Sequence, residues 1–323
     1  MDIMQILALV VPAAIFAAAP LILTALGGLF SERAGVVNIG LEGLMVMGAF
    51  TAIVTTLTLE GMGMGGMSVI LLALVISVLI GAFFSLFHAV ASITFRADQI
   101  VSGVALNFLA VGLTVFLVRL LYNKGQTDYI SNRIYRTDIE FLSLSEWPIV
   151  GPLFFSNVHF TSYMAILLAV IVYLVVFYTP FGLRLRSVGE HPMAADTMGI
   201  NVNRMRYLGV MLSGAFAGLG GAVFALTVTG NFSGTTIVGQ GFMALAALIF
   251  GKWNPLGALG AALFFGLAQA LSITGQQIPL LAGVPPVFLM IAPYVLTILA
   301  LAGFVGRAEA PKAIGKPYIK GSR

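Results

Sequence analysis

The chain has 323 residues, of which 59% are hydrophobic and only 9% are charged, and its mean hydropathy is +1.04. A soluble domain usually carries about 25% charged residues, so this composition excludes the two soluble domains that the length alone would suggest. The absence of cysteine excludes disulfides, thiolate metal sites and thiol catalysis. The net charge of +4 is too small to indicate a nucleic-acid partner, so we expect its distribution among the loops to matter instead.

Apolar segments recur along the whole chain at a length that crosses a membrane, which takes about 20 helical residues. The segment 241–250 is shorter, and we predict a half-helix there, preceded by irregular backbone over 231–240. Such backbone survives at membrane depth only where protein or a water-filled cavity covers it. The sequence therefore predicts an all-α polytopic membrane protein with about nine transmembrane segments, the half-helix included. The full-length spans are predicted at 3–30, 39–57, 68–95, 100–122, 161–179, 207–229, 256–274 and 287–306.

The charged loops orient the chain, because cytoplasmic loops carry an excess of lysine and arginine. The loop 180–206 has four arginines against two acids, and the tail 307–323 has five basic residues against one acid, so we place both in the cytoplasm. The segment 123–160 leans acidic and is predicted to be extracytoplasmic. Nine crossings satisfy all three placements. They give a transmembrane domain over 1–306 with its N-terminus outside and its C-terminus in the cytoplasm.

Two glycine-marked helix starts resemble each other. Residues 40–50, GLEGLMVMGAF, align with residues 238–248, VGQGFMALAAL, so that Glu42 falls on Gln240 and Gly43 on Gly241. Four spans, one lone span and four further spans would make the second set an inverted copy of the first. Many transporters are built in this way and bind solute near the middle of the bilayer, between the repeats. The match is short and glycine-rich, so a chance match stays open.

A charged and polar stretch follows the first span. Glu32 and Arg33 are neighbours at its cytoplasmic end, where they could pair with each other or extend to water. Asn38 and Glu42 are four residues apart and share one helix face. A carboxylate inside a span is rare and usually faces the bundle interior or an aqueous path. Glu42 therefore has two interpretations: it anchors the start of its helix, where the dipole favours negative charge, or it forms a polar wall of a permeation path.

Other polar residues within the spans are neutral. Asn231 and Gln240 precede the predicted half-helix, and such amides would suit a neutral solute such as a sugar or nucleoside, although loop side chains often cap helices instead. Asn107 lies in the middle of the fourth span, where helix–helix hydrogen bonding is its expected role. His88 is expected to be a packing residue. The candidate residues of the substrate pathway are thus Asn38, Glu42, Asn107, Asn231 and Gln240.

Catalytic and metal-binding motifs are missing from the sequence. It contains no HExxH, no GxSxG in a strand–helix setting and no GxxxxGK[ST], since Gly251-Lys252 is followed by Trp253. We therefore predict a transport protein rather than an enzyme, without metal or cofactor in this chain. If ATP drives transport, another subunit binds and hydrolyses it.

Residues 189–196, GEHPMAAD, are predicted to form a short helix with Pro192 in its first turn. This segment is either a docking helix for a partner or an ordinary solvated loop.

Two stretches are distinctive: ERAGVVNIGLEGLMVMGAF at 32–50 and GLRLRSVGEHPMAADTMGINVNRMRYLGVMLSGAFAGLGGA at 182–222. Both resemble the membrane permeases of bacterial ABC importers, in the branch that includes ribose-type sugar, branched-chain amino acid and nucleoside permeases. The NIGLEG motif is most similar to the nucleoside, basic-membrane-protein-type subgroup. The GxDLSVGS-like sequence of the sugar permeases is missing here. The resemblance covers essentially all of 1–306.

This resemblance implies roles and partners. The family's coupling region, which rests in a cleft of an ABC ATPase subunit, matches Gly189, Glu190, Pro192, Ala194, Ala195 and Gly199. Such permeases work in pairs, and nucleoside members typically use a second, related permease chain. An extracytoplasmic substrate-binding protein delivers solute, and the segment 123–160 is a candidate docking surface for it. The implied location is the bacterial cytoplasmic membrane, with membrane lipid around the chain.

Other functions stay open at this point. A sugar or a branched-chain amino acid could be the solute of a permease in the same family. A secondary transporter driven by an ion gradient would also have broken helices, with Glu42 as the lone candidate for ion coupling. A channel would leave the GEHPMAA loop unexplained, and a membrane-embedded enzyme would lack any catalytic constellation.

Overall fold

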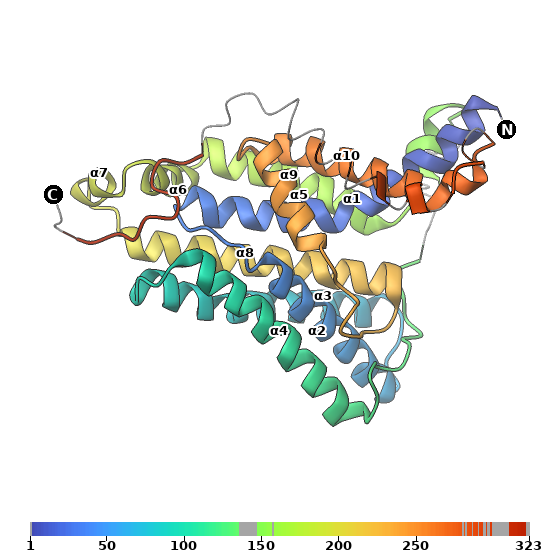
Figure 1. The fold of residues 1–323 in the computed structure, drawn as a ribbon, viewed down its shortest axis with the longest axis horizontal. Helices are drawn as coiled ribbons and strands as arrows, with labels where there is room; N and C mark the ends of the chain where they lie inside the picture. The colour runs from blue at the N-terminus through green and yellow to red at the C-terminus, as the bar shows by residue number, and fades with distance from the viewer. Residues whose placement is uncertain are drawn as a thin grey trace.

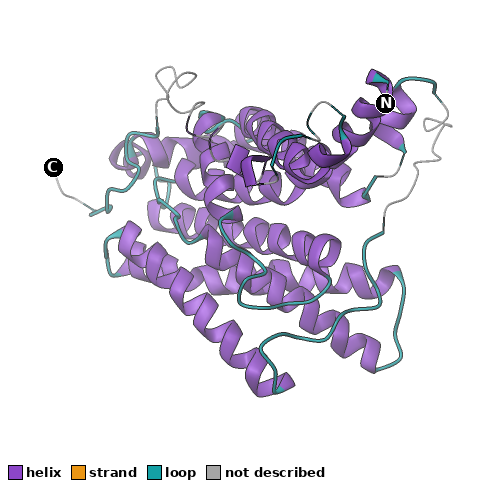
Figure 2. Ribbon diagram, turned by 45° about the vertical axis from the view of Figure 1, so that its right-hand side comes forward, coloured by secondary structure: helices purple, strands orange, loops and turns teal. Residues whose placement is uncertain are grey.

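The computed structural model describes residues 2–135, 147–156, 158–279 and 310–320, with scattered positions between 281 and 298. Within these ranges all regular structure is helical, and the one β-type contact is an isolated bridge between Gln126 and Ser233 (Figure 2). Seven helical segments of the described chain are long and apolar enough to cross a membrane. The prediction of an all-α, multi-pass membrane protein is confirmed. The last predicted span, 287–306, lies largely outside the described residues.

The helices agree with the predicted segments. The predicted half-helix is present as an 11-residue helix, and the span predicted at 207–229 begins five residues earlier because the Asn201 side chain accepts a hydrogen bond from the Arg204 amide and caps it. Three of the helices carry short π-helical or 3-10 continuations at their ends. The elements are α1 Ile3–Arg33, α2 Leu41–Gly61, α3 Met67–Ala89 with η1 Val90–Thr94, α4 Gln99–Tyr122, η3 Gly151–Phe155, α5 Phe160–Tyr178, α6 Pro180–Glu190, α7 Pro192–Thr197, α8 Val202–Phe224 with η4 Ala225–Thr229, α9 Gln240–Phe250, and α10 Pro255–Thr274 with η5 Gly275–Gln277.

The helices form two groups that meet along α1 and α8. Helices α5, α9 and α10 pack around α1, whereas α2 and α3 pack against α8, and α4 lies on the outer side of α2 (Figure 1). The start of α1 lies at one end of the long axis, and α6, α7 and the segment 310–320 gather at the other end. One end of the bundle therefore carries α6, α7 and the segment 310–320, and the opposite end carries the start of α1 with η3 beside it.

Close contact between helices depends on glycines in α8. A Cβ atom built on Gly218 would lie 2.6 Å from the carbonyl oxygen of Ser77, and one built on Gly48 would collide with the Gly218 backbone. Gly81 of α3 and Gly214 of α8 are in contact in the same way. Small residues let helix backbones approach closely in lipid, where packing rather than the hydrophobic effect holds helices together. The glycine-rich sequence GAFAGLGGA of α8 thus lets both α2 and α3 pack closely against it.

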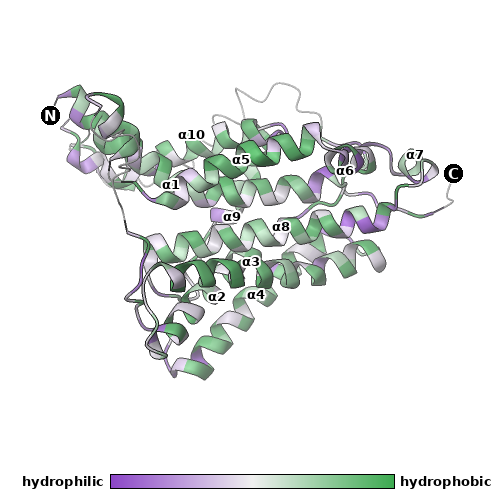
Figure 3. Cartoon of the chain, turned by 180° about the vertical axis from the view of Figure 1, so that it is seen from behind, coloured by the Kyte–Doolittle hydropathy of each residue, from purple (hydrophilic) through white to green (hydrophobic). Residues whose placement is uncertain are grey.

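The outer surface of the bundle is apolar. Helix α4 buries a single stripe at helical spacing, formed by Gly103, Leu106, Ala110, Thr114 and Val118, and leaves most of its other apolar side chains exposed. Figure 3 shows hydrophobic residues along the length of α3, α4 and α5, and hydrophilic residues near the end where α6 and α7 lie. An exposed apolar surface of this extent would aggregate in water, and it fits a lipid environment.

Candidate functional site

The backbone between α1 and α2 is not helical over residues 34–40, and side chains from other helices satisfy its polar groups. The Val37 amide donates to the Gln99 side-chain oxygen at 2.7 Å, and the Val37 carbonyl oxygen lies 2.9 Å from Nε2 of His88. Because a carbonyl only accepts, Nε2 carries the proton, and Nδ1 accepts from the Ser102 hydroxyl at 2.9 Å. His88 is therefore a satisfied packing residue, as predicted, and it braces the break between two helices.

Asn38 lies inside this break and is fully buried. Its side-chain NH2 donates to the Ser213 hydroxyl of α8 at 2.8 Å, and its side-chain oxygen accepts from the Gly40 amide at 3.1 Å. Ala34 packs against Gly209 of α8, whereas Asn38 contacts Ser213, which lies one helical turn further along α8. Residues 34–38 therefore run about 6 Å back into the bundle. Helix α2 thus begins inside the bundle, and Asn38 holds its approach to α8.

Asn107 of α4 supports the same break from the other side. Its side-chain oxygen accepts from the Gly43 amide at 2.7 Å, and its NH2 group donates to the Ile39 carbonyl oxygen at 3.1 Å. Gly43 is in the first turn of α2, where the amides have no partner within the helix. Asn107 therefore makes the helix–helix hydrogen bonds that were predicted for it, and in this conformation both ends of its amide are engaged.

Glu42 binds the start of a different helix. Its two carboxylate oxygens accept from the Gly239 and Gly241 amides at 2.5 and 2.6 Å, and only 8% of the residue is exposed. A Cβ on Gly241 would lie 2.5 Å from the Glu42 backbone, so the two backbones touch. The first amides of a helix and its dipole attract an anion. Of the two interpretations of Glu42, the geometry supports the anchoring one, but the anchored helix is α9 and not its own helix α2.

The two similar glycine-marked helix starts are therefore in direct contact. The start of α2, with Glu42, faces the start of α9, with Gln240, and the Gln240 side-chain oxygen accepts from the Val238 amide at 2.6 Å. Asn231 lies elsewhere: its neighbours Gly230 and Phe232 are hydrogen-bonded to the segment that follows α4. The structure thus brings four of the predicted pathway residues together at one junction and places Asn231 apart from it.

Glu32 and Arg33 do not pair with each other, and Glu32 is buried whereas Arg33 is half-buried. Trp253, in the turn between α9 and α10, donates its indole N–H to the Glu32 carboxylate at 2.5 Å. Arg33 donates from two nitrogens to the Trp253 carbonyl oxygen at 2.8 and 2.6 Å, and its guanidinium lies 5.9 Å from the centre of the Phe177 ring. Both charged residues hold the α9–α10 turn against the end of α1. The sequence could not show this because the partners are about 220 residues apart.

Gly189 and Glu190 belong to the end of α6, so the short helix predicted over 189–196 is present only as α7, Pro192–Thr197. Pro192 is its first residue, where the missing N–H costs nothing. Gly199 has φ +80°, a conformation that favours glycine, and the Ile200 amide donates to the Ala195 carbonyl oxygen at 3.0 Å to close the helix end. The two alanines differ: Ala195 is buried and Ala194 is exposed. Ala194 and Ala195 therefore do not share one exposed face of α7.

The exposed side of α7 and its following turn carries methionines. Met198 is 81% exposed and Met193 is 39% exposed. Methionine is flexible and polarisable, and it adapts to partner surfaces. Unlike the apolar residues of α3 and α4, these two stand at the hydrophilic end of the molecule (Figure 3). They form, with Ala194, an apolar patch on α7 that sequence reasoning did not single out.

The C-terminal segment 310–320 packs on the base of this region. The Ala313 amide donates to the Gly189 carbonyl oxygen at 2.9 Å, and the Lys312 amide lies 3.5 Å from the half-buried Glu190 carboxylate. A Cβ on Gly189 would collide with the carbonyl oxygen of Arg33, so α6 also touches the end of α1. Gly189 and Glu190 thus join the predicted coupling region to α1 and to the chain end, which holds α7 on a rigid base.

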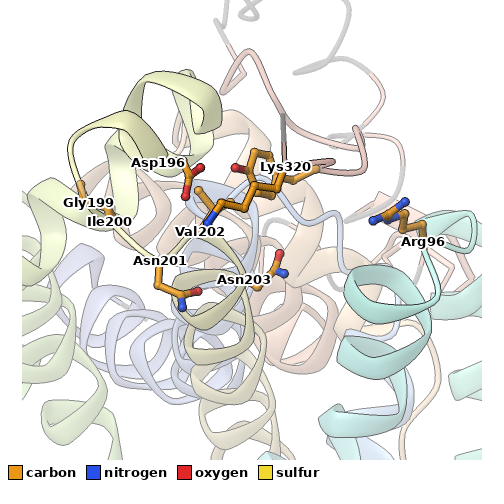
Figure 4. Close-up of a pocket in the computed structure, with 9 residues that line it drawn as sticks. Arg96, Asp196, Gly199, Ile200, Asn201, Val202, Asn203 and Lys320 are labelled. Carbon is orange, nitrogen blue, oxygen red and sulfur yellow. The ribbon is translucent and has the colours of Figure 1, made fainter. Parts of the chain in front are cut away.

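A surface pocket of about 370 Å³ opens between this segment and the start of α8 (Figure 4). Asp196 and Lys320 face one another across it, with Asn201 and Asn203 below and Arg96 at its edge. Tyr318 also lines the pocket, and burial, together with the neighbouring Asp196 carboxylate, raises the pKa of its phenol. Within the described ranges no group of three or more His, Cys, Asp and Glu side chains could hold a metal ion.

Comparison with known proteins assigns the chain to a family. The profile of the family described as "Branched-chain amino acid transport system / permease component" matches residues 11–301. The chain belongs to this family. It is therefore a transport permease and not an enzyme, and the predicted family and class are confirmed.

Individual relatives match over essentially the whole chain. The "Guanosine ABC transporter permease protein NupQ" of Bacillus subtilis is 61% identical over 100% of both chains. The "Nucleoside ABC transporter permease protein NupC" of Lactococcus lactis subsp. cremoris is 49% identical over 99% of both. The "Putative glucose ABC transporter permease protein TsgC13" of Haloferax volcanii is 33% identical over 95% of this chain and 96% of its own.

Proposed function

We propose that this chain is the permease subunit of an ATP-driven ABC importer that moves nucleosides across the bacterial cytoplasmic membrane. The observation that carries the proposal is the 61% identity, without a gap in coverage, to a chain named a guanosine permease. A sugar is the second candidate solute, because a chain named a putative glucose permease is also similar, but at 33% identity. The neutral amides and hydroxyls of the broken helices fit either solute better than an ion.

The permease domain extends over 1–306 and crosses the membrane nine times, the half-helix α9 and the span 287–306 included. Its two halves are inverted repeats. Support comes from the aligned starts of α2 and α9, which lie in contact through Glu42. In repeat-built transporters the broken helices of the two halves meet near the middle of the bilayer, where the solute passes.

The end of the bundle that carries α6, α7 and the segment 310–320 faces the cytoplasm, and the start of α1 faces outward. The arginines of 180–206 and the basic residues of 307–323 support this orientation through the positive-inside rule. The acidic-leaning segment 123–160, part of which lies outside the described residues, then faces the extracytoplasmic binding protein. Membrane lipid covers the apolar faces of α3, α4 and α5.

The ABC ATPase subunit binds at α7. The apolar patch of Met193, Ala194 and Met198 lies on a helix whose base is fixed to α1 and to the segment 310–320. ATP binds to that partner and not to this chain. A second, related permease chain completes the path. The ATPase needs to bias only a two-state equilibrium between outward-open and inward-open forms, and a shift from 1:99 to 99:1 takes about 5.5 kcal/mol.

Uptake of radiolabelled guanosine tests the proposal in a strain that produces the chain with its ATPase, permease partner and binding protein. We expect ATP-dependent uptake of guanosine and none of glucose. Met198→Asp should abolish uptake and retention of the ATPase during purification, because a charge would replace an apolar side chain in the exposed patch. Met62→Asp is the matched control, since Met62 is 70% exposed at the opposite end of the bundle.

Three outcomes contradict the proposal. Glucose uptake without guanosine uptake would favour the sugar. Full guanosine uptake by the Met198→Asp variant would refute docking at α7. Guanosine transport by the purified chain alone in liposomes, driven by an ion gradient and without ATPase, would make it a secondary transporter.

A further inference from the structure

A cavity of about 270 Å³ lies between α1, the end of α8 with η4, the start of α9 and the end of α10. We propose that this cavity, lined by Phe16, Phe224, Gln240, Gln269 and Ser272, holds the base of the nucleoside during its passage. The inference rests on the proposed function and names the site at which the permease itself contacts the solute. The volume is near the lower end of the roughly 300–1,000 Å³ of small-molecule pockets, which suits one flat ring system.

Three irregularities of the helices meet at this cavity. Val228 belongs to the π-helical turn η4, Gln240 is the first residue of the broken helix α9, and Pro20 lies inside α1. Single π-helical turns within helices often mark functional sites, and discontinuous helices form the solute sites of many transporters. The cavity therefore lies where three helices are irregular, and of the predicted pathway residues Gln240 lines it.

The two polar side chains that α10 contributes to the cavity are hardly used by the fold, whereas the Gln240 oxygen accepts from the Val238 amide. The Gln269 amide nitrogen has a single, long contact of 4.0 Å with the Met243 sulfur. The Ser272 hydroxyl makes no hydrogen bond to any described residue, whereas the Thr274 hydroxyl, two residues later, donates to the Ala270 carbonyl oxygen at 2.8 Å. By contrast, both ends of the Asn38 and Asn107 side chains are engaged within the protein. The groups available to a solute are thus on α10 and not at the α2 junction.

The composition of the cavity favours a nucleobase over a free sugar. Three of its ten lining residues are polar, and the remaining seven include two phenylalanines. A free sugar has a hydroxyl on nearly every carbon, and each buried hydroxyl needs a hydrogen-bond partner. A base instead presents two apolar faces that stack on aromatic rings, and one edge whose donors and acceptors match a glutamine amide. Phe16 is held in place by stacking on His159, with ring centres 4.6 Å apart.

The cavity is also coupled to the junction between the halves. Gln240 lies between Gly239 and Gly241, whose amides donate to the Glu42 carboxylate. Any movement of α2 relative to α9 therefore moves one wall of the cavity against α10. This link explains how a change driven from the cytoplasmic end would alter contact with the solute, because Glu42 ties the start of α2 to the wall of the cavity that α9 forms.

The natural absence of cysteine makes a direct test possible. In the assembled transporter we expect Ser272→Cys to react with a methanethiosulfonate reagent, and guanosine to slow the reaction at least threefold. Ribose at the same concentration should leave the rate unchanged. Ser68→Cys, exposed at the start of α3, is the matched control whose rate should not respond to guanosine. A rate at Ser272→Cys that guanosine does not change would overturn the assignment.

Uptake gives an independent test. Gln269→Met keeps the length of the side chain and removes its amide, so we expect at least a tenfold lower maximal rate of guanosine uptake with an unchanged half-saturation concentration. The half-saturation stays because the binding protein is the same. Gln276→Met, at an exposed position after the same helix, should transport normally. Normal rates of guanosine uptake in Gln269→Met would refute the assignment of the cavity as the base site and leave the proposed function intact. A wild-type strain that imports no guanosine would refute both the proposed function and the base site.

Discussion

The carboxylate of Glu42 joins the start of α2 to the start of α9, and a substitution that changes one atom tests this contact. Glu42→Gln replaces one carboxylate oxygen by an NH2 group, so one of the amides of Gly239 and Gly241 loses its acceptor and faces a donor instead. The side chain keeps its size, and the close approach of the Glu42 backbone to Gly241 is not disturbed. The variant therefore isolates the charge and one hydrogen bond from packing.

The expected loss follows from these hydrogen bonds. A hydrogen bond to a charged group contributes about 1.5–3 kcal/mol, and the attraction of a charge to a partly buried helix start contributes up to about 2 kcal/mol. Burying a charge has its own cost, which the neutral glutamine avoids. We therefore expect a loss in the lower part of the range that these two contributions give together. A loss of about 2 kcal/mol corresponds to roughly 30-fold faster opening of the start of α9.

Amide hydrogen exchange, followed by mass spectrometry on the purified transporter, measures this opening. We expect peptides that cover 237–243 to exchange roughly 30-fold faster in Glu42→Gln. Glu60→Gln is the matched control: Glu60 also accepts from backbone amides, those of Ser131 and Asn132, but at the other end of α2. It should loosen residues 130–132 and leave α9 unchanged. Unchanged exchange over 237–243 in Glu42→Gln, with altered guanosine uptake, would refute anchoring and restore Glu42 as a wall of the path.

Three further predictions concern the packing of the bundle. Asn107→Leu leaves the Gly43 amide buried without an acceptor, which costs about 1–3 kcal/mol, and should speed exchange over 39–43. Gly218→Leu places a side chain against backbone and should prevent recovery of a monodisperse protein in detergent, whereas Gly112→Leu, with open space around it, should not. Trp253→Phe removes the indole hydrogen bond to the buried Glu32 carboxylate and should lower the midpoint of thermal unfolding.

Each of these has a result that contradicts it. Equal exchange over 39–43 in Asn107→Leu would mean that water or another group takes over from the amide. A well-behaved Gly218→Leu protein would show that α3 and α8 can separate, and the close glycine packing would then not be required. An unchanged unfolding midpoint in Trp253→Phe would show that the carboxylate does not depend on the indole.

Hydropathy along the sequence determined where the membrane helices lie, because a stretch of about 20 apolar residues has few stable alternatives to a membrane helix. The same local reasoning located the half-helix α9, since its 11 residues are too few to cross. Local sequence also predicted Pro192 in the first turn of α7 and a packing role for His88. Each of these conclusions depends on the composition of a single segment, which can be read from the sequence without knowledge of the tertiary structure.

Only the tertiary structure decided which polar groups meet. Glu42 binds amides about 200 residues away, and Glu32 and Arg33 hold a tryptophan of the α9–α10 turn. The burial of Ala195 and the docking of 310–320 on α6 likewise depend on how helices cross. A buried polar group forms hydrogen bonds with whichever partner the packing brings within reach. The packing itself depends on close approaches at glycines spread over several helices, and no local pattern encodes the crossing that results.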